Sequence, residues 1–263
     1  MPALGSSLGR RLMLALILAF AAAALGALPA TAADPDALWK VVHGQCVPDQ
    51  IRHHHPAPCT RVDLHRGVAR GHVVLKDRSG ATQFLVIPTA RVTGIDSPLL
   101  LARHAPNYWA PAWPARRLVF ARASRALPRD AIALAINSVE GRSQNQLHIH
   151  VDCVRPDVRD YLTAHVAEVP PRWSDWTVHF DGHRFWAMRL AAADLNRINL
   201  FDLLANGIPG ARDHMGDWTL VAVGVEPTGF IVLAGHVDPA TGDRGAGEAL
   251  QDHGCALAQM LPQ

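Results

Sequence analysis

The amino-acid sequence predicts an α+β fold in which a mainly antiparallel sheet is flanked by helices. Three observations carry this prediction. Strand-length segments follow one another across short turns, helical segments separate them, and the order of elements partly recurs after residue 170. The chain has 263 residues, of which 49% are hydrophobic and 18% charged, enough for one large core or two small ones.

The N-terminal segment, residues 1–32, is typical of an export signal. Arg10 and Arg11 precede an apolar run from Leu12 to Leu28, and small residues suitable for cleavage after Ala32 follow. The run is at the lower length limit for a membrane span, so an uncleaved N-terminal anchor is an alternative. We therefore expect an exported domain over residues 33–263, located in the periplasm if cleaved or on the inner membrane if anchored.

The first half of this domain is expected at about residues 40–168. It opens with a Pro- and His-rich stretch, in which His53-His54-His55 is interpreted as a surface loop rather than a metal site. The predicted elements then follow in order: strands Gly71–Lys76 and Gln83–Pro88, a helix from about Asn107 to Ala126, the strand Gln146–Cys153, and a helix from Pro156 to about Val166. We expect Trp109 and Trp113, four residues apart on one helix face, to pack in the core.

A second half, about residues 172–263, follows the break at Pro170-Pro171. Its first two strands are predicted to form a hairpin around Asp181-Gly182, a strong two-residue turn signal. The predicted elements are strands Trp176–Phe180 and His183–Leu190, a helix from Asp194 to Ala205 ended by Asn206-Gly207, strands Trp218–Val225 and Gly229–His236, and a terminal helix near Gly247–Met260. The similar order predicts two similar halves.

Four cysteines form an even set in a chain expected to reach an oxidising compartment, so two disulfides are predicted. Of the three possible pairings, the short loop favours Cys46 with Cys59, which leaves Cys153 for Cys255. Zinc is disfavoured because the sequence has no Cys-x-x-Cys pair.

The charge balance disfavours nucleic acid as a partner. Without residues 1–32, the chain has 23 basic and 23 acidic residues, because Arg10 and Arg11 carry all the charge of that segment. No run of Lys and Arg is present to follow a polyanion.

Residues 141–151, Gly-Arg-Ser-Gln-Asn-Gln-Leu-His-Ile-His-Val, are the most informative stretch. If they are extended, Gln144, Gln146, His148 and His150 share one face of the strand, and the apolar residues between them face the core. A loop of small residues precedes the histidines and can offer backbone N–H groups to an anion. The pattern predicts a neutral imidazole placed at a phosphate.

The stretch resembles the active-site strand of the histidine triad superfamily, with Gln146 in place of the first His, His148 as the middle, nucleophilic His, and His150 as the third. It is more similar still to the bacterial CDP-diacylglycerol pyrophosphatases, whose pattern matches Ala135–Pro156 nearly throughout. Further matching segments are Leu75–Arg78, Val86–Pro88, Ser97–Leu101, His214–Gly216 and Asp252–Cys255. The resemblance implies a histidine triad-like fold and hydrolysis of CDP-diacylglycerol to CMP and phosphatidate at a membrane surface.

The resemblance also implies roles for individual residues. His148 is expected to attack the cytidine-side phosphorus and form a nucleotidyl-histidine, and His150 to contact phosphate or transfer a proton. The residues expected to bind the substrate are Asn137, Arg142, Ser143, Gln144 and Gln146. The chemistry needs no metal or other cofactor.

Three alternatives remain open from the sequence. A nucleotidyltransferase would use the same histidine but pass CMP to an acceptor other than water. A non-catalytic nucleotide- or lipid-binding protein would keep the fold without turnover. A metal-dependent phosphatase would use His148 and His150 as ligands, but it needs nearby carboxylates, and only Asp152 shares their face. The sequence does not indicate an oligomeric state.

Overall fold

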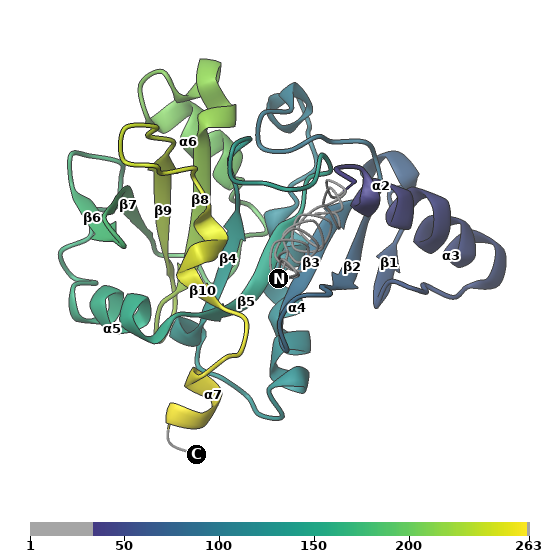
Figure 1. Cartoon of the computed structure of the whole chain (residues 1–263), viewed down its shortest axis with the longest axis horizontal. Helices are drawn as coiled ribbons and strands as arrows, with labels where there is room; N and C mark the ends of the chain where they lie inside the picture. Colours follow the sequence, from purple (N-terminus) through teal and green to yellow (C-terminus); the bar gives the residue numbers. More distant parts are fainter. Residues whose placement is uncertain (1–33, 262–263) are drawn as a thin grey trace, which may run out of the picture. The chain divides into compact units, whose positions relative to one another are not determined.

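A large antiparallel sheet organises the chain in the computed structural model, which describes residues 34–261 (Figure 1). The expected signal segment, residues 1–32, lies outside the described residues. The sheet order is β1-β2-β3-β5-β4-β8-β9-β7-β6, and β10 pairs with the end of β5. The strands are β1 (Arg61–Asp63), β2 (His72–Lys76), β3 (Phe84–Pro88), β4 (Ile132–Ile136), β5 (Ile149–Val154), β6 (Thr177–Phe180), β7 (His183–Leu190), β8 (Trp218–Gly224), β9 (Phe230–His236) and β10 (Gln251–Asp252).

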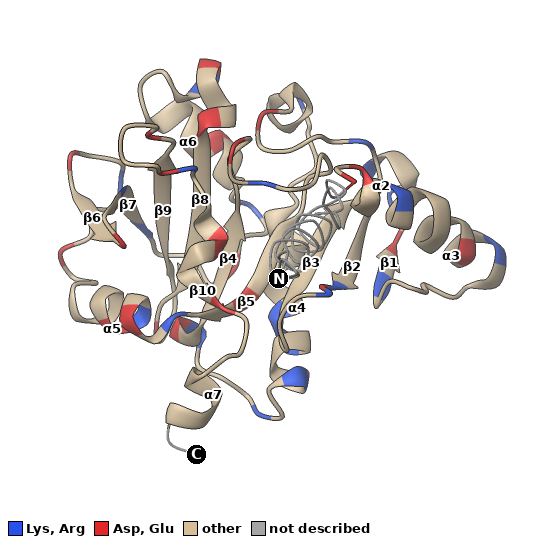
Figure 2. Cartoon of the chain, viewed as in Figure 1, with Lys and Arg blue, Asp and Glu red and all other residues tan. Residues whose placement is uncertain are grey.

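Helices flank this sheet, so the predicted α+β class with a mainly antiparallel sheet is confirmed. The α-helices are α2 (Ala37–Val41), α3 (Val47–His53), α4 (Trp109–Arg122), α5 (Pro156–Ala164), α6 (Leu200–Gly207) and α7 (Leu257–Met260). A π-helical turn, η1 (Val42–Cys46), joins α2 to α3, and the 3₁₀ turns are η2 (Val68–Arg70), η3 (Pro98–Leu101), η4 (Arg129–Ala131), η5 (Ala211–Asp217) and η6 (Gly247–Leu250). Figure 2 shows that Lys, Arg, Asp and Glu lie mostly on helices and loops, while the strands carry few of them.

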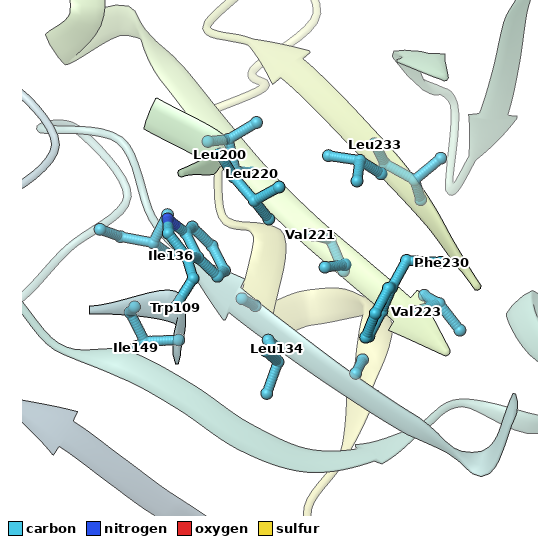
Figure 3. Close-up of a cluster of buried hydrophobic side chains, with 14 of the residues drawn as sticks. Trp109, Leu134, Ile136, Ile149, Leu200, Leu220, Val221, Val223, Phe230 and Leu233 are labelled. Carbon is cyan, nitrogen blue, oxygen red and sulfur yellow. The ribbon is translucent and has the colours of Figure 1, made fainter. Parts of the chain in front are cut away.

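Helix α4 packs on one face of the sheet, against β3, β4 and β5. Trp109 and Trp113 are buried, as predicted, and Trp109 lies near Ile136 and Ile149 (Figure 3). Because side chains alternate along β5, Ile149 and Val151 join this core, and the side chains of His148 and His150 are left for the opposite face.

A smaller apolar cluster forms from the N-terminal helices and the first strands. Val42, Val47 and the disulfide-bonded Cys46 and Cys59 pack with a set of strand residues, namely Val73, Leu85 and Ile87. In the β3–β5 register Leu85 pairs with His150, so this cluster lies on the sheet face that carries the histidines. The helical form of residues 37–53 was missed, since the Pro and His content indicated a loop. The surface position of His53–His55 is confirmed by their exposure.

Several local predictions hold. Asp181 and Gly182 have φ angles of 53° and 82° and close the β6–β7 hairpin, as expected for a turn that needs two left-handed residues. Both predicted disulfides, Cys46–Cys59 and Cys153–Cys255, are present. Helix α5 begins at Pro156, and α6 ends at Gly207.

Two predicted helices differ from the structure. The α6 helix begins at Leu200 instead of Asp194, because Asn199 caps it by accepting a hydrogen bond from Phe201 N. The expected helix over 247–260 is wrong. The segment forms η6, β10 and α7 instead, because its middle pairs with β5 and the disulfide of Cys255 attaches it to Cys153.

Candidate active site

The candidate site is a row of three side chains on one face of β5 and the residue before it: His148, His150 and Asp152. The imidazole centroids of His148 and His150 are 4.8 Å apart, which confirms that they share a face. In the neighbouring strand β4, the residues opposite His150 and Asp152 are Ala135 and Ala133. Both are small side chains, so neither extends far over the imidazoles.

His148 is oriented by its own main chain. Its Nδ1 lies 2.7 Å from the carbonyl oxygen of Gln146 and must donate to it, since a carbonyl only accepts. The neutral ring therefore carries its proton on Nδ1 and a lone pair on Nε2. Within the described residues, Nε2 has no hydrogen-bond partner. A nitrogen with a free lone pair is what nucleophilic attack on phosphorus requires.

The environment keeps His148 neutral. Its side chain is largely buried, with the residue 7% exposed, and this burial lowers its pKa below the ordinary value of 6.5. The charge of Arg142 acts in the same direction. The hydrogen bond to Gln146 and the carboxylates of Glu248 and Asp77 oppose the shift but do not reverse it.

One ring nitrogen of His150 has a hydrogen-bond partner, and the other has none among the described residues. The side-chain amide nitrogen of Gln83 lies 2.8 Å from Nδ1, and in the tautomer that accepts from this amide the ring proton is on Nε2. Nε2 is buried and has no partner among the described residues. Burial, and after it the imidazoles of His148 and His253, keep the pKa of His150 well below 6.5. A buried N–H donor without an acceptor is suited to a phosphate oxygen of a ligand.

Glu248 enters the site from η6 and was not predicted from the sequence. One of its carboxylate oxygens lies 3.1 Å from His150 Nδ1, and the other accepts from the Asn137 side chain at 2.9 Å. Asn137 Oδ1 also accepts from Glu248 N at 3.1 Å. Asn137 is thus in the site but already paired with Glu248, and its expected contact with phosphate or sugar stays a prediction.

The side chain of Gln146 fixes the neighbouring loop. Its amide donates to the carbonyl oxygens of Pro88 and Ala90 at 3.0 and 2.8 Å, and its Oε1 accepts from Val92 N at 3.4 Å. The fixed peptide then presents the carbonyl that orients His148. A contact between the Gln146 amide and phosphate would have to replace these bonds, and it stays a prediction.

The other residues predicted to bind the substrate lie in the loop before β5 and differ in their partners and exposure. The strand begins at Ile149 rather than Gln146, so strict alternation does not extend back through the loop. Arg142 pairs with Asp96, and Ser143 is exposed. The Gln144 Oε1 accepts from Leu38 N at the start of α2, at 3.0 Å, and so points toward that helix. The roles expected for these three residues in binding stay predictions.

A second cluster joins the row at the far end of β5. Asp152 is fully buried, and its carboxylate accepts from Thr82 Oγ1 at 2.6 Å, from Cys153 N at 2.8 Å and from His253 Nδ1 at 2.9 Å. The signal for His253 was present in the sequence, within the matching segment Asp252–Cys255. Nothing in that segment alone indicated that it reaches the histidines of β5.

Comparison with known proteins gives consistent matches. A family model described as CDP-diacylglycerol pyrophosphatase matches residues 33–259, a range that includes every site residue named above. A CDP-diacylglycerol pyrophosphatase from Yersinia pestis is 40% identical over 227 residues, which is 86% of this chain and 86% of that relative.

Proposed function

Because the chain belongs to the CDP-diacylglycerol pyrophosphatase family, we propose that it hydrolyses CDP-diacylglycerol to CMP and phosphatidate, with His148 as the nucleophile. The substrate follows from the family. The observation that supports the mechanism is the orientation of His148, whose Nδ1–H donates to Gln146 O and whose Nε2 lone pair is unpaired.

The reaction divides into two displacements. In the first, His148 Nε2 attacks the phosphorus on the cytidine side, a nitrogen–phosphorus bond forms, and the bond to the bridging oxygen breaks. Phosphatidate leaves with that bond's electron pair. In the second, water attacks the same phosphorus and gives up a proton, the nitrogen–phosphorus bond breaks with its electron pair returning to Nε2, and CMP leaves. A neutral nucleophile suits the first step because it adds no charge repulsion to a diphosphate that is already anionic.

Two neighbours support the displacement. The Nε2–H of His150 is a buried, unpaired donor beside His148, suited to a non-bridging oxygen that gains charge during attack. If His150 takes up a second proton, its Nδ1 can donate to the Glu248 carboxylate, which lies 3.1 Å away. The scheme uses no metal ion, so we expect activity to persist in excess chelator.

The chain is expected to act outside the cytoplasm. Its two disulfides suit an oxidising compartment, and the basic-then-apolar pattern of residues 1–32 supports export. Within residues 34–261, no helix combines the length and hydropathy needed to cross a bilayer. We propose that the domain meets its lipid-nucleotide substrate at the surface of the inner membrane, either anchored by the N-terminal segment or released from it.

The test is release of CMP and phosphatidate from CDP-diacylglycerol in detergent micelles. His148→Ala should lower kcat by roughly four decades, the loss typical of a covalent nucleophile. His65→Ala, which removes an exposed imidazole from a loop, is the matched control and should leave the rate unchanged. Near-normal turnover by His148→Ala would refute the assignment of the nucleophile, and no CMP from the unsubstituted protein would refute the substrate.

A further inference from the structure

His253 extends the row of site residues by one position, although it is 103 to 105 residues distant from His148 and His150 in the chain. Its Nδ1 donates to the buried Asp152 at 2.9 Å, and its charge acts on His150. Alternate residues of a strand are about 6.8 Å apart. The row therefore runs from His148 through His150 to the Asp152–His253 pair, in the direction of the strand.

The His253 imidazole is fixed by the chain on each side of it. Ala81 N donates to His253 O at 2.8 Å, and Asp252 pairs with Cys153 across the β10–β5 ladder. Two residues after His253, Cys255 forms a disulfide with Cys153 and so attaches this segment to β5. Gly80 packs so closely that an added Cβ would lie 2.4 Å from the Cβ of His253. A side chain fixed in this way is preorganised for one orientation.

The remaining edge of the ring is open. The side chain of His253 is 33% exposed, and within the described residues its Nε2 has no hydrogen-bond partner. Two cations near the site already have partners. Arg142 pairs with Asp96, and Lys76 Nζ donates to the carbonyls of Asp77 and Gly80 at 2.7 and 3.0 Å. Protonated His253 is therefore a cationic hydrogen-bond donor whose Nε2–H has no partner among the described residues.

We propose that His253 binds the lipid-side phosphate of the substrate, the group that leaves with phosphatidate when His148 attacks the cytidine-side phosphorus. The inference rests on the proposed function. It is argued from the order of the row: if the attacked phosphorus lies at His148 and its oxygens contact His150, a diphosphate aligned with the row has its second phosphate on the side of His253. The imidazolium then supplies the positive charge that Gln146, standing at the first position of the histidine pattern, does not.

The charges that face His253 favour this role. The hydrogen bond that His253 donates to Asp152 raises the pKa of His253 above 6.5. Burial opposes this shift, and the carboxylates of Glu248 and Asp77 act in the same direction as Asp152. His150 faces the same ring but is neutral, because its own pKa is well below 6.5. Since the pKa of His148 is lowered, an interval of pH around 6.5 exists in which His148 is neutral and His253 is charged.

The test compares two substrates in one set of variants. CDP-diacylglycerol has a second phosphate in its leaving group, whereas the p-nitrophenyl ester of CMP offers the same phosphorus without one. His253→Gln should lower kcat/KM for CDP-diacylglycerol by about 100-fold, the loss expected for one charged hydrogen-bond donor. The p-nitrophenyl ester should be affected less than about threefold. His148→Ala should abolish both activities, and His65→Gln should change neither.

An equal loss on both substrates would overturn the proposal, because it would indicate a structural role for His253. So would full activity of His253→Gln on CDP-diacylglycerol. Failure of the proposed function gives a different result: the unsubstituted protein would cleave the p-nitrophenyl ester but not CDP-diacylglycerol.

A second variant keeps the proposal testable if His253→Gln does not fold. Asp152→Asn removes the carboxylate that raises the pKa of His253. With CDP-diacylglycerol, the alkaline limb of kcat/KM should therefore move to lower pH. With the p-nitrophenyl ester it should not move. An unmoved alkaline limb for CDP-diacylglycerol would contradict the proposed role of the charged imidazole.

Discussion

Replacing Asp152 with alanine should destabilise the protein by about 2–4 kcal/mol. The carboxylate is fully buried and accepts from Thr82 Oγ1, Cys153 N and His253 Nδ1. A buried donor left without an acceptor costs about 1–3 kcal/mol. Cys153 N loses this acceptor in a buried position. Thr82 can turn its hydroxyl to His253 O, now 3.3 Å away, and His253 reaches solvent, so these two contribute less.

Asp152→Asn separates the hydrogen bonds from the charge. Its side-chain oxygen can still accept from Thr82 and Cys153, and its amide can donate to a neutral His253, so we expect a loss of only about 1 kcal/mol. Urea unfolding with the disulfides intact, followed by the fluorescence of the seven tryptophans, measures both values. Asp175→Ala, at an exposed position, is the control and should stay within about 0.5 kcal/mol of the parent. An Asp152→Ala variant as stable as this control would refute the role assigned to the buried carboxylate.

Three further predictions concern activity. Because burial lowers the pKa of His148, the nucleophile stays neutral as pH falls through 6.5. The acid limb of the pH profile of kcat/KM should therefore lie below pH 6.5. An acid limb above that value would contradict the environment described for His148. Glu248→Gln keeps the pairing with Asn137 but removes the charge beside His150. This variant should have a kcat that is roughly 10- to 100-fold lower and an unchanged unfolding midpoint. An unaltered kcat would exclude Glu248 from the chemistry. Gly247→Ala would place a Cβ 2.3 Å from Thr219 Oγ1 and 2.8 Å from Val221 Cγ2, so η6 must shift. We expect this variant to lose about 1–3 kcal/mol of stability and to be less active. In the control Gly242→Ala, the Cβ meets no atom within 4 Å but the φ angle is 77°, so stability should fall without a loss of activity.

The sequence was most informative where local chemistry decides the structure. Alternation along residues 148–151 placed the two imidazoles on one face, and Asp181-Gly182 specified its hairpin turn. The cysteine pairing followed from a short loop and the one remaining pair. Each of these predictions depends on neighbouring residues or on counting, so no knowledge of distant contacts was needed.

Contacts between distant segments could not be predicted in the same way. Gln83, Glu248 and His253 approach β5 from the start of β3 and from the C-terminal segment, and their roles depend on how the sheet assembles. The terminal helix was wrongly expected because its apolar spacing gave no sign of pairing with β5. The contact of Gln144 with Leu38 at the start of α2 could not be predicted either, because it depends on where the N-terminal helices pack.

The most direct test of the account is to trap the covalent intermediate. CDP-diacylglycerol is mixed with enzyme for one turnover, the reaction is stopped with alkaline denaturant, which preserves a phosphorus–nitrogen bond, and the peptides are analysed by mass spectrometry. A cytidylyl group on the imidazole of His148, absent from the His148→Ala protein, is the predicted result. An unmodified His148 during steady turnover, or the adduct on another residue, would contradict the account.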